Sequence, residues 1–273
     1  MALPLSPQVF TILGALVEAR AGLHYGANDR ELFAEKVSAR AIEQGFESLL
    51  DYYYFMRYDP GGDEELGRLV DSLVVHETYF FREREQVEWL VDGFLAPRVA
   101  AGRRPRVLSA ACATGEEPLS LAMLLADRGL GGSVEIVGAD ISERALARAR
   151  EGVYPPRSLR HSHPPGAARR FLREEGGRLV VAREVHRDVS WRRANLIVPA
   201  EVEALGGFDA ILCRNVLIYF DDSRAQEVIE TLSARLADDG LLLVGVSESL
   251  LRFGSSVECE ERGGVFVYRP VRR

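Results

Sequence analysis

The sequence predicts an α/β protein in which an N-terminal helical bundle precedes a domain built on a mainly parallel sheet, with a small antiparallel β subdomain inserted into that domain. Three observations predict this. Apolar residues recur at helical spacing up to about residue 101, short apolar runs alternate with helical segments over residues 102–273, and the alternation fails at about residues 153–194. Parallel strands are buried on both faces, so they give continuous apolar runs of this kind.

The helical bundle follows from apolar spacing. Val9, Ile12 and Leu16 stand three and four positions apart, and no stretch of the first hundred residues reads as a strand. Turn residues break the pattern at 24–29, at Gly45 and at 59–62. We therefore expect about four short helices, followed by a longer one from Glu83.

The second part alternates strands and helices. Strands are expected at Arg106–Ala110, Val134–Asp140, Phe208–Cys213 and Leu241–Gly245. Helices are expected at Glu117–Leu125, Glu143–Arg150 and Ser223–Ala237. Ser142 is expected to cap the second of these helices, and Gly240 to supply a positive φ after the third.

An inserted subdomain is expected because the alternation of strands and helices stops after Gly152. A helix-like segment at Ala167–Glu174 precedes two β-like stretches, Arg178–Arg183 and Val185–Trp191. We interpret both stretches as strands of one small antiparallel sheet within the insertion.

Composition excludes several classes of protein. The net charge of −7 gives no global attraction for nucleic acid, and no apolar run is long enough to span a bilayer. The apolar N-terminus has no basic region before it, so we expect no secretory signal. Three scattered cysteines fit a reducing cytoplasm. His161 and His163 have no third ligand nearby in the sequence, so we expect no metal.

Candidate ligand-binding residues follow the strands, because open α/β sheets bind ligands beyond the carboxyl ends of their strands. The turn at residues 111–118 is built of small residues around Gly115, which lets the backbone approach a ligand. Asp140 ends the next strand, where a carboxylate can accept both hydroxyls of a ribose.

The same arrangement serves nicotinamide enzymes, but this turn lacks the G-x-G-x-x-G spacing that seats a pyrophosphate. Glu116 and Glu117 would repel a phosphate and would suit a cationic ligand such as S-adenosylmethionine, which carries an ammonium and a sulfonium. The alternative is that the two acids only complement the dipole of the helix they begin.

Five segments in order resemble motifs of the chemotaxis receptor methyltransferase (CheR) family. They are His76–Glu83, Ser109–Pro118, Gly138–Ser142, Phe208–Phe220 and Gly245–Leu250. Together they extend over nearly the whole chain. The resemblance implies a Rossmann-like class I methyltransferase domain and an S-adenosylmethionine-dependent protein-glutamate O-methyltransferase, with S-adenosylhomocysteine as the product.

The resemblance also implies roles for single residues. Thr78 and Arg82 should face the amino-acid end of the cofactor, Glu117, or with less support Glu116, should bind its ammonium, and Asp140 its ribose. The remaining cofactor-binding residues are Ala111, Gly115, Ile141, Asn215 and, on the adenine side, Asn195 and Leu196.

In the implied reaction a glutamate carboxylate attacks the methyl carbon in line with the departing sulfur. With a reference pKa near 4.3 the carboxylate is already ionised, so no general base is needed. Positioning can supply roughly 7–11 kcal/mol. Arg98, Arg214 and Tyr219 are expected to orient and neutralise the incoming carboxylate, although Arg98 is nearly as well explained as a surface cation beside Pro97.

The implied partner is the cytoplasmic domain of methyl-accepting chemoreceptors, bound by a monomer. Lys36, Arg40 and Arg57 are candidates for a basic patch that contacts it, but interspersed glutamates make a solvated face an equal alternative. Two other functions stay open: a methyltransferase acting on a different carboxylate or a small molecule, and a cofactor-binding signalling module without turnover.

Overall fold

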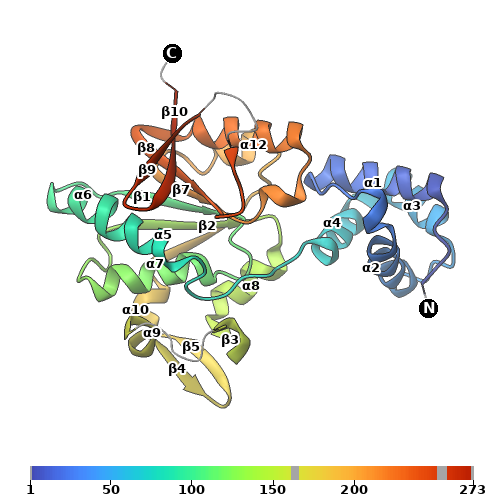
Figure 1. Ribbon diagram of the computed structural model, residues 1–273. Coiled ribbons are helices and arrows are strands. Elements are labelled where there is room, and N and C mark those ends of the chain that lie inside the picture. The colour runs from blue at the N-terminus through green and yellow to red at the C-terminus, as the bar shows by residue number, and fades with distance from the viewer. Residues whose placement is uncertain (1, 161–165, 251–256, 272–273) are drawn as a thin grey trace. The chain divides into compact units, whose positions relative to one another are not determined.

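The computed structural model describes residues 2–160, 166–250 and 257–271 (Figure 1). These form two compact units, Met1–Val75 with Tyr219–Arg224, and His76–Ile218 with Ala225–Arg273. His161 and His163 lie outside the described residues. Within the described part of the chain, no helix is both long and apolar enough to cross a membrane.

The helical unit contains the four expected helices. They are α1 (Pro7–Ala21), α2 (Arg30–Glu43), α3 (Leu49–Tyr58) and α4 (Gly62–Leu73), with a 3₁₀ turn η1 (Ala27–Asp29) between the first two. The Ser6 and Ser48 hydroxyls accept N–H bonds at the starts of α1 and α3, as N-caps do. Leu13, Phe33 and Leu69 are fully buried between the helices.

The helical unit ends at Val75, whereas the sequence led us to expect a domain boundary at residue 101. The segment after it forms α5 (Arg84–Trp89), η2 (Leu90–Leu95) and α6 (Ala96–Ala100). Its apolar residues, including Leu90 and Phe94, pack into the core of the second unit. A helix that belongs to the sheet domain therefore precedes the first strand.

The second unit is organised around a seven-stranded sheet in the order β6-β2-β1-β7-β8-β10-β9. The strands are β1 (Arg106–Ala110), β2 (Glu135–Asp140), β6 (Val189–Arg193), β7 (Phe208–Cys213), β8 (Leu236–Val244), β9 (Val257–Arg262) and β10 (Val265–Pro270). The first five are mutually parallel, and β10 is antiparallel to both of its neighbours, β8 and β9. The prediction of a parallel sheet with strands at Arg106–Ala110 and Phe208–Cys213 is confirmed.

Helices cover both faces of this sheet, with α12 on one face and α7 and α8 on the other (Figure 1). Their bounds are α7 (Glu116–Asp127), α8 (Glu143–Glu151) and α12 (Asp222–Ser233), and the short connections are η3 (Pro156–Ser158), α11 (Pro199–Glu203) and η4 (Leu217–Tyr219). Ser142 caps α8 as expected, since its hydroxyl accepts the Ala145 N–H at 3.1 Å.

Two details near β8 correct the sequence analysis. The helix expected to reach Ala237 ends at Ser233, and β8 begins at Leu236. Gly240 therefore lies within a strand and has no positive φ. It is a glycine for another reason: a Cβ there would lie 3.0 Å from the Asp209 carbonyl oxygen of the neighbouring strand.

The inserted subdomain contains a three-stranded antiparallel sheet, β3-β5-β4, formed by β3 (Val153–Tyr154), β4 (Leu172–Glu175) and β5 (Arg178–Val181). The short helices α9 (Gly166–Phe171) and α10 (Arg183–His186) flank it. The expectation that Val185–Trp191 adds a strand to this sheet is wrong, because β6 pairs with β2 and is the edge strand of the main sheet. The helix expected to reach Glu174 ends at Phe171, because the residues from Leu172 onward form β4 and pair with β5.

Candidate functional site

The chain order of the strands reverses between β1 and β7. From β1 the chain proceeds outward through β2 and β6, and it then returns to place β7 on the other side of β1. Ala110 pairs with Ala139 on one side and with Cys213 on the other, so the loops that follow these strands meet at one edge. Such a reversal point is where open α/β sheets bind ligands.

Asp140 fixes the first of these loops. Its side chain is buried, one carboxylate oxygen accepts the Ala113 N–H at 2.8 Å, and the other accepts the Ser142 N–H at 2.9 Å. A carboxylate oxygen can accept more than one hydrogen bond, so this geometry is compatible with ribose hydroxyls as further donors. Asp140 is therefore both a ligand candidate and a support of the loop.

Glu117 and Arg214 form an ion pair across the reversal point. Arg214 Nη1 lies 2.8 Å from Glu117 Oε2, and the Ser109 hydroxyl donates to Glu117 Oε1 at 2.6 Å. Arg214 Nη2 also donates to Glu83 Oε2 at 2.9 Å and to the Arg82 carbonyl. One guanidinium thus faces two carboxylates, which leaves an excess of negative charge at this edge of the sheet.

Arg214 lies deeper than its expected role requires. Its side chain is 1% exposed, and both Nη atoms donate to acceptors of its own unit, whereas its buried Nε has no hydrogen-bond partner. In the structure Arg214 is therefore a partner of Glu117 and Glu83.

Glu116 points away from Glu117. Its carboxylate accepts the Thr114 hydroxyl at 2.6 Å and the Ser158 hydroxyl at 3.0 Å. Burial raises the pKa of Glu116, and these hydroxyl hydrogen bonds oppose part of that rise. Of the two candidates for the ammonium, Glu117 is the one that lies beside the β7 loop.

Gly115 is required by a side chain that sequence reasoning missed. A Cβ at Gly115 would lie 2.6 Å from the Trp191 ring, and one at Gly138 would lie 2.7 Å from the same ring. Gly115 also has a φ of 92°. The Trp191 indole therefore occupies the space that two glycines leave open beneath the first loop.

Several residues near the reversal point have strained backbone conformations with positive φ. Among the described residues, the non-glycine residues with positive φ are Phe81, Glu83, Ala111, Ala113 and Asn215, at 61°, 48°, 54°, 50° and 59°. They lie in the segment before α5, the β1 loop and the β7 loop. Such conformations cost about 1–3 kcal/mol each and typically occur at functional sites. No local sequence signal marks Glu83, which is the second residue that sequence reasoning missed.

The remaining cofactor candidates lie in the same unit. Asn195 and Leu196 follow β6 and are buried, and the Ala194 N–H donates to the Asp140 carbonyl, which places them beside the β2 end. Ile141 follows Asp140 directly. Arg82 donates to the Glu77 carbonyl at 3.0 Å, so its side chain lies along the segment that contains Thr78.

Arg98 is not brought together with these residues. It lies on α6, and its guanidinium donates to the Asp239 carboxylate at 2.8 Å and lies 4.0 Å from Asp209. Asp209 is the second residue of β7, so this ion pair lies at the amino end of that strand, opposite the loops described above. Tyr219, the third residue expected to orient the acceptor, belongs to the helical unit, where its carbonyl accepts the His24 N–H.

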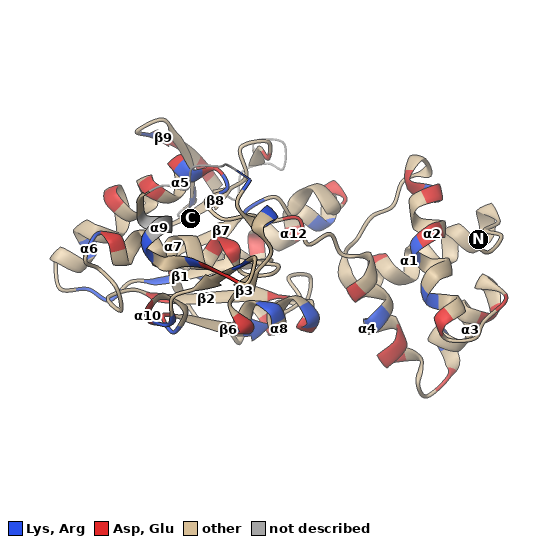
Figure 2. Ribbon diagram, turned by 90° about the horizontal axis from the view of Figure 1, so that it is seen from below, with Lys and Arg blue, Asp and Glu red and all other residues tan. Residues whose placement is uncertain are grey.

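Lys36 and Arg40, two of the three residues considered for a basic patch, are hydrogen-bonded within the helical unit. Arg40 is bonded to Glu65 at 2.6 Å and to Glu43, and the Lys36 ammonium donates to the Leu73 carbonyl at 3.1 Å. Both signs of charge alternate over its helices (Figure 2). These contacts favour the second alternative, in which the charged residues of the helical unit form a solvated face and pair with one another.

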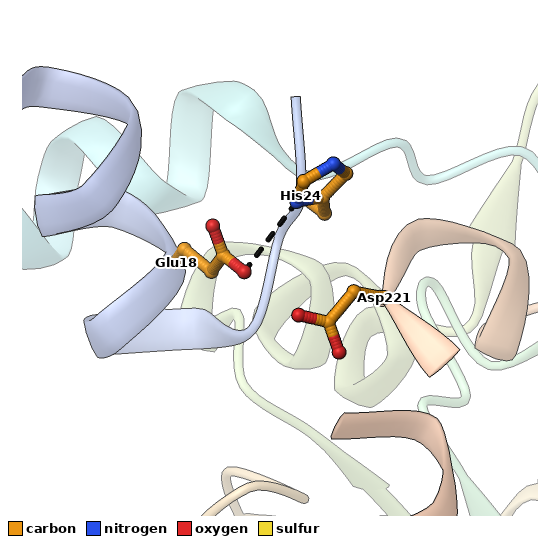
Figure 3. Close-up of side chains that lie close together, drawn as sticks. All are labelled: Glu18, His24 and Asp221. Carbon is orange, nitrogen blue, oxygen red and sulfur yellow. Dashed lines mark hydrogen bonds and ion pairs between the residues drawn. The ribbon is translucent and has the colours of Figure 1, made fainter. Parts of the chain in front are cut away.

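A second cluster of titratable groups also lies in the helical unit. Glu18, His24 and Asp221 direct their side chains toward one another (Figure 3), with His24 Nδ1 3.4 Å from Glu18 Oε1. The Arg224 N–H donates to Asp221 and, as the largest effect, lowers the pKa of that carboxyl. His24 is exposed, so this is a surface cluster in which Asp221, from residues 219–224, lies close to Glu18 of α1.

A cavity of about 1020 Å³ adjoins the reversal point on the side of β8 and β10. Glu83, Gly245 and Glu248 line it, together with aromatic residues such as Tyr79 and Phe266. Neither Glu117 nor Asp140 is among its lining residues.

The residues at the reversal point fit S-adenosylmethionine. Glu117 offers a carboxylate to an ammonium, Asp140 offers one to a ribose, and the excess negative charge around Arg214 suits a doubly cationic nucleoside. A dinucleotide would bring a pyrophosphate to this acidic loop, which the same charge disfavours.

Comparison with known proteins identifies the family of this chain. The family model "CheR methyltransferase, SAM binding domain" matches residues 76–262. "Chemotaxis protein methyltransferase 2" of Vibrio cholerae is 33% identical over 89% of this chain and 86% of its own length. The protein of the same name in Pseudomonas aeruginosa is 36% identical over 94% and 87%.

Other matches are less complete. "Probable biofilm formation methyltransferase WspC" of Pseudomonas aeruginosa is 35% identical over 86% of this chain, which spans 56% of that protein. Among solved structures, TrmN from Thermus thermophilus matches with a TM-score of 0.39 at 19% identity, covering 65% of this chain and 48% of that one. The family match and the extent of the chemotaxis relatives show that this chain belongs to the CheR methyltransferase family and that S-adenosylmethionine is its cofactor.

Proposed function

We propose that this protein methylates glutamate side chains on the cytoplasmic domain of bacterial chemoreceptors, giving glutamate methyl esters for sensory adaptation. The observation that carries the proposal is the acidic strand-end site, in which Glu117 and Asp140 lie on either side of the β1 loop within a chain of the CheR family. The chemotaxis relatives support the receptor as substrate.

The residues of this chain would act by binding and orientation. When bound, S-adenosylmethionine supplies an electrophilic methyl group. In the proposal, Glu117 binds its ammonium, Asp140 its ribose, and Asn195 with Leu196 its adenine. Thr78 and Arg82 bind its carboxylate. Ala111, Gly115, Ile141 and Asn215 shape the loops around these contacts.

The acceptor needs no base, because a glutamate carboxylate is ionised at neutral pH. Its approach to an acidic site is opposed by charge, so a neutralising group is required. Arg214 forms ion pairs with Glu83 and Glu117 and so offsets part of their negative charge. We propose Tyr219, four residues after Asn215 in the chain, as the hydroxyl that orients the acceptor.

The proposal is tested by incubating the protein with methyl-labelled S-adenosylmethionine and chemoreceptor cytoplasmic fragments. Label that enters the receptor and is released by mild base identifies a methyl ester. Base-stable label would show a different acceptor, and absence of label despite cofactor binding would show a module without turnover. Receptors from a biofilm-signalling system should be included, because a relative of that description matches 86% of this chain.

A further inference from the structure

Glu248 is a buried carboxylate at the reversal point to which the proposed mechanism gives no role. It follows β8, is 7% exposed, and accepts three backbone N–H groups. Its Oε2 accepts from Asn215 at 2.6 Å and from Gly245 at 2.8 Å, while its Oε1 accepts from Leu217 at 2.9 Å. One carboxylate therefore joins the loops that follow β7 and β8.

Asn215 is held from two sides. Its backbone N–H is bonded to Glu248, and its side-chain amide lies 3.4 Å from Glu83 Oε1. Glu83 in turn accepts the Val246 N–H at 3.2 Å and the Arg214 guanidinium. The two carboxylates thus fix both the backbone and the side chain of this asparagine.

Close packing leaves this arrangement little freedom. A Cβ at Gly245 would lie 2.5 Å from the Asn215 side-chain nitrogen and 2.8 Å from Glu248 Oε2. Asn215 also has a φ of 59°, a conformation that persists only where the surroundings impose it. The N–H bonds to Glu248 are the contacts that impose it on the backbone.

We propose that Glu248 is a positioning residue of the methyltransferase site, which acts by fixing the backbone at Asn215 and Leu217 so that Asn215 faces the cofactor. The inference rests on the function proposed above for that site. It assigns to Glu248 no contact with the reacting atoms. Its effect on catalysis passes through the loop that follows β7.

The test is Glu248→Gln, which keeps the shape but replaces one oxygen by an NH₂ group. That donor would face a backbone N–H that now has no acceptor. Stranding such a buried donor should weaken binding of S-adenosylhomocysteine by roughly tenfold or more. Isothermal titration calorimetry on the full chain measures it.

The matched control is Glu65→Gln in the helical unit. Glu65 is another buried carboxylate, 2% exposed and bonded to Arg40 and Tyr52. Its replacement should lower the thermal midpoint and leave the affinity for S-adenosylhomocysteine unchanged. Equal weakening of affinity in both variants would reduce Glu248 to a general contributor to folding and overturn the inference.

A second measurement does not depend on the variant folding. In the wild-type protein without ligand, hydrogen exchange at the Asn215 and Leu217 amides should already be slow, because Glu248 accepts a hydrogen bond from each of these N–H groups. Fast exchange that slows only when S-adenosylhomocysteine is added would show that the ligand orders this loop, contrary to the proposal.

The outcomes separate the inference from the proposed function. A wild-type protein that neither binds S-adenosylhomocysteine nor labels a receptor contradicts the function. A wild-type protein that does both, beside a folded Glu248→Gln variant of equal affinity, contradicts only the role of Glu248.

Discussion

Asp140 has a structural role, and the proposed function adds a binding role to the same side chain. Its two oxygens accept the N–H groups of Ala113 and Ser142, so its removal would release the first loop as well as delete the proposed ribose contact. Effects on affinity and on stability are therefore expected together, and a control close in sequence is needed to separate them.

We predict that Asp140→Ala weakens S-adenosylhomocysteine binding by about 1–3 kcal/mol, the cost of leaving buried hydrogen-bond partners unsatisfied. Glu143→Ala is the control, since Glu143 is exposed and lies in the same segment. Calorimetry that gives equal affinities for the two variants would remove Asp140 from the cofactor site.

Arg98 and Arg214 give a paired prediction. Arg98→Gln removes bonds to Asp239 of β8 and the contact with Asp209 near the amino end of β7, so it should lower the unfolding temperature and leave turnover per folded molecule unchanged. Arg214→Gln exposes the repulsion between Glu83 and Glu117, so it should lower activity. Steady-state kinetics of both variants test these predictions. A large loss of kcat in Arg98→Gln would show that Arg98 acts on the acceptor carboxylate, as first expected from the sequence.

At the scale of elements, helix α7 carries a glycine at each end, and the two have different causes. Gly115 precedes the helix with a φ of 92° and lies against Trp191, whereas Gly129 follows it with a φ of 72° and open space around it. Only the first glycine is demanded by packing as well as by backbone conformation.

Gly129→Ala should therefore cost only backbone strain, about 1–2 kcal/mol. Gly115→Ala should cost that amount plus about 1–3 kcal/mol for overpacking against the indole. Urea denaturation of both variants measures the difference. Equal losses would show that the Trp191 ring moves aside without cost.

The strands at the site could be predicted from the sequence because each is a continuous apolar run bounded by turn residues, as at Arg106–Ala110 and Phe208–Cys213. Asp140 and Glu117 could be proposed as candidates because Asp140 ends one such run and Glu117 comes after the loop that follows another. The place of β6 could not be predicted, since pairing with β2 is set by tertiary structure. The position of Arg98 could not be predicted either. The spacing of apolar residues does not tell at which end of the sheet helix α6, which precedes β1, places its side chains. The positive φ of Glu83 has no local signal either.

At the scale of the whole molecule, two carboxyl groups shift in opposite directions. The Arg103 hydrogen bond lowers the pKa of Asp239 from 3.8, so its contribution to stability is present above that pH and is lost as the pH falls through the folded-state pKa. Burial raises the pKa of Glu116 from 4.5, so its charged form destabilises the fold as the pH rises through the folded-state pKa.

Denaturation midpoints between about pH 3 and pH 8 should separate these contributions. Asp239→Asn should be less stable than wild type at pH values above 3.8, and the difference should shrink as the pH falls below that value. Glu116→Gln should gain stability relative to wild type as the pH rises. Parallel curves for all three proteins would contradict both assignments.

Residues 219–224 belong to the helical unit, although they include the last residue of η4 and the first three residues of α12, whose remaining residues belong to the sheet domain. The polypeptide therefore passes from one unit to the other at three places, and the second and third passages come soon after Asn215. Replacing the first 75 residues by a foreign helical module would leave these six residues without their native neighbours. Such a replacement must therefore exchange residues 219–224 together with the first 75 residues.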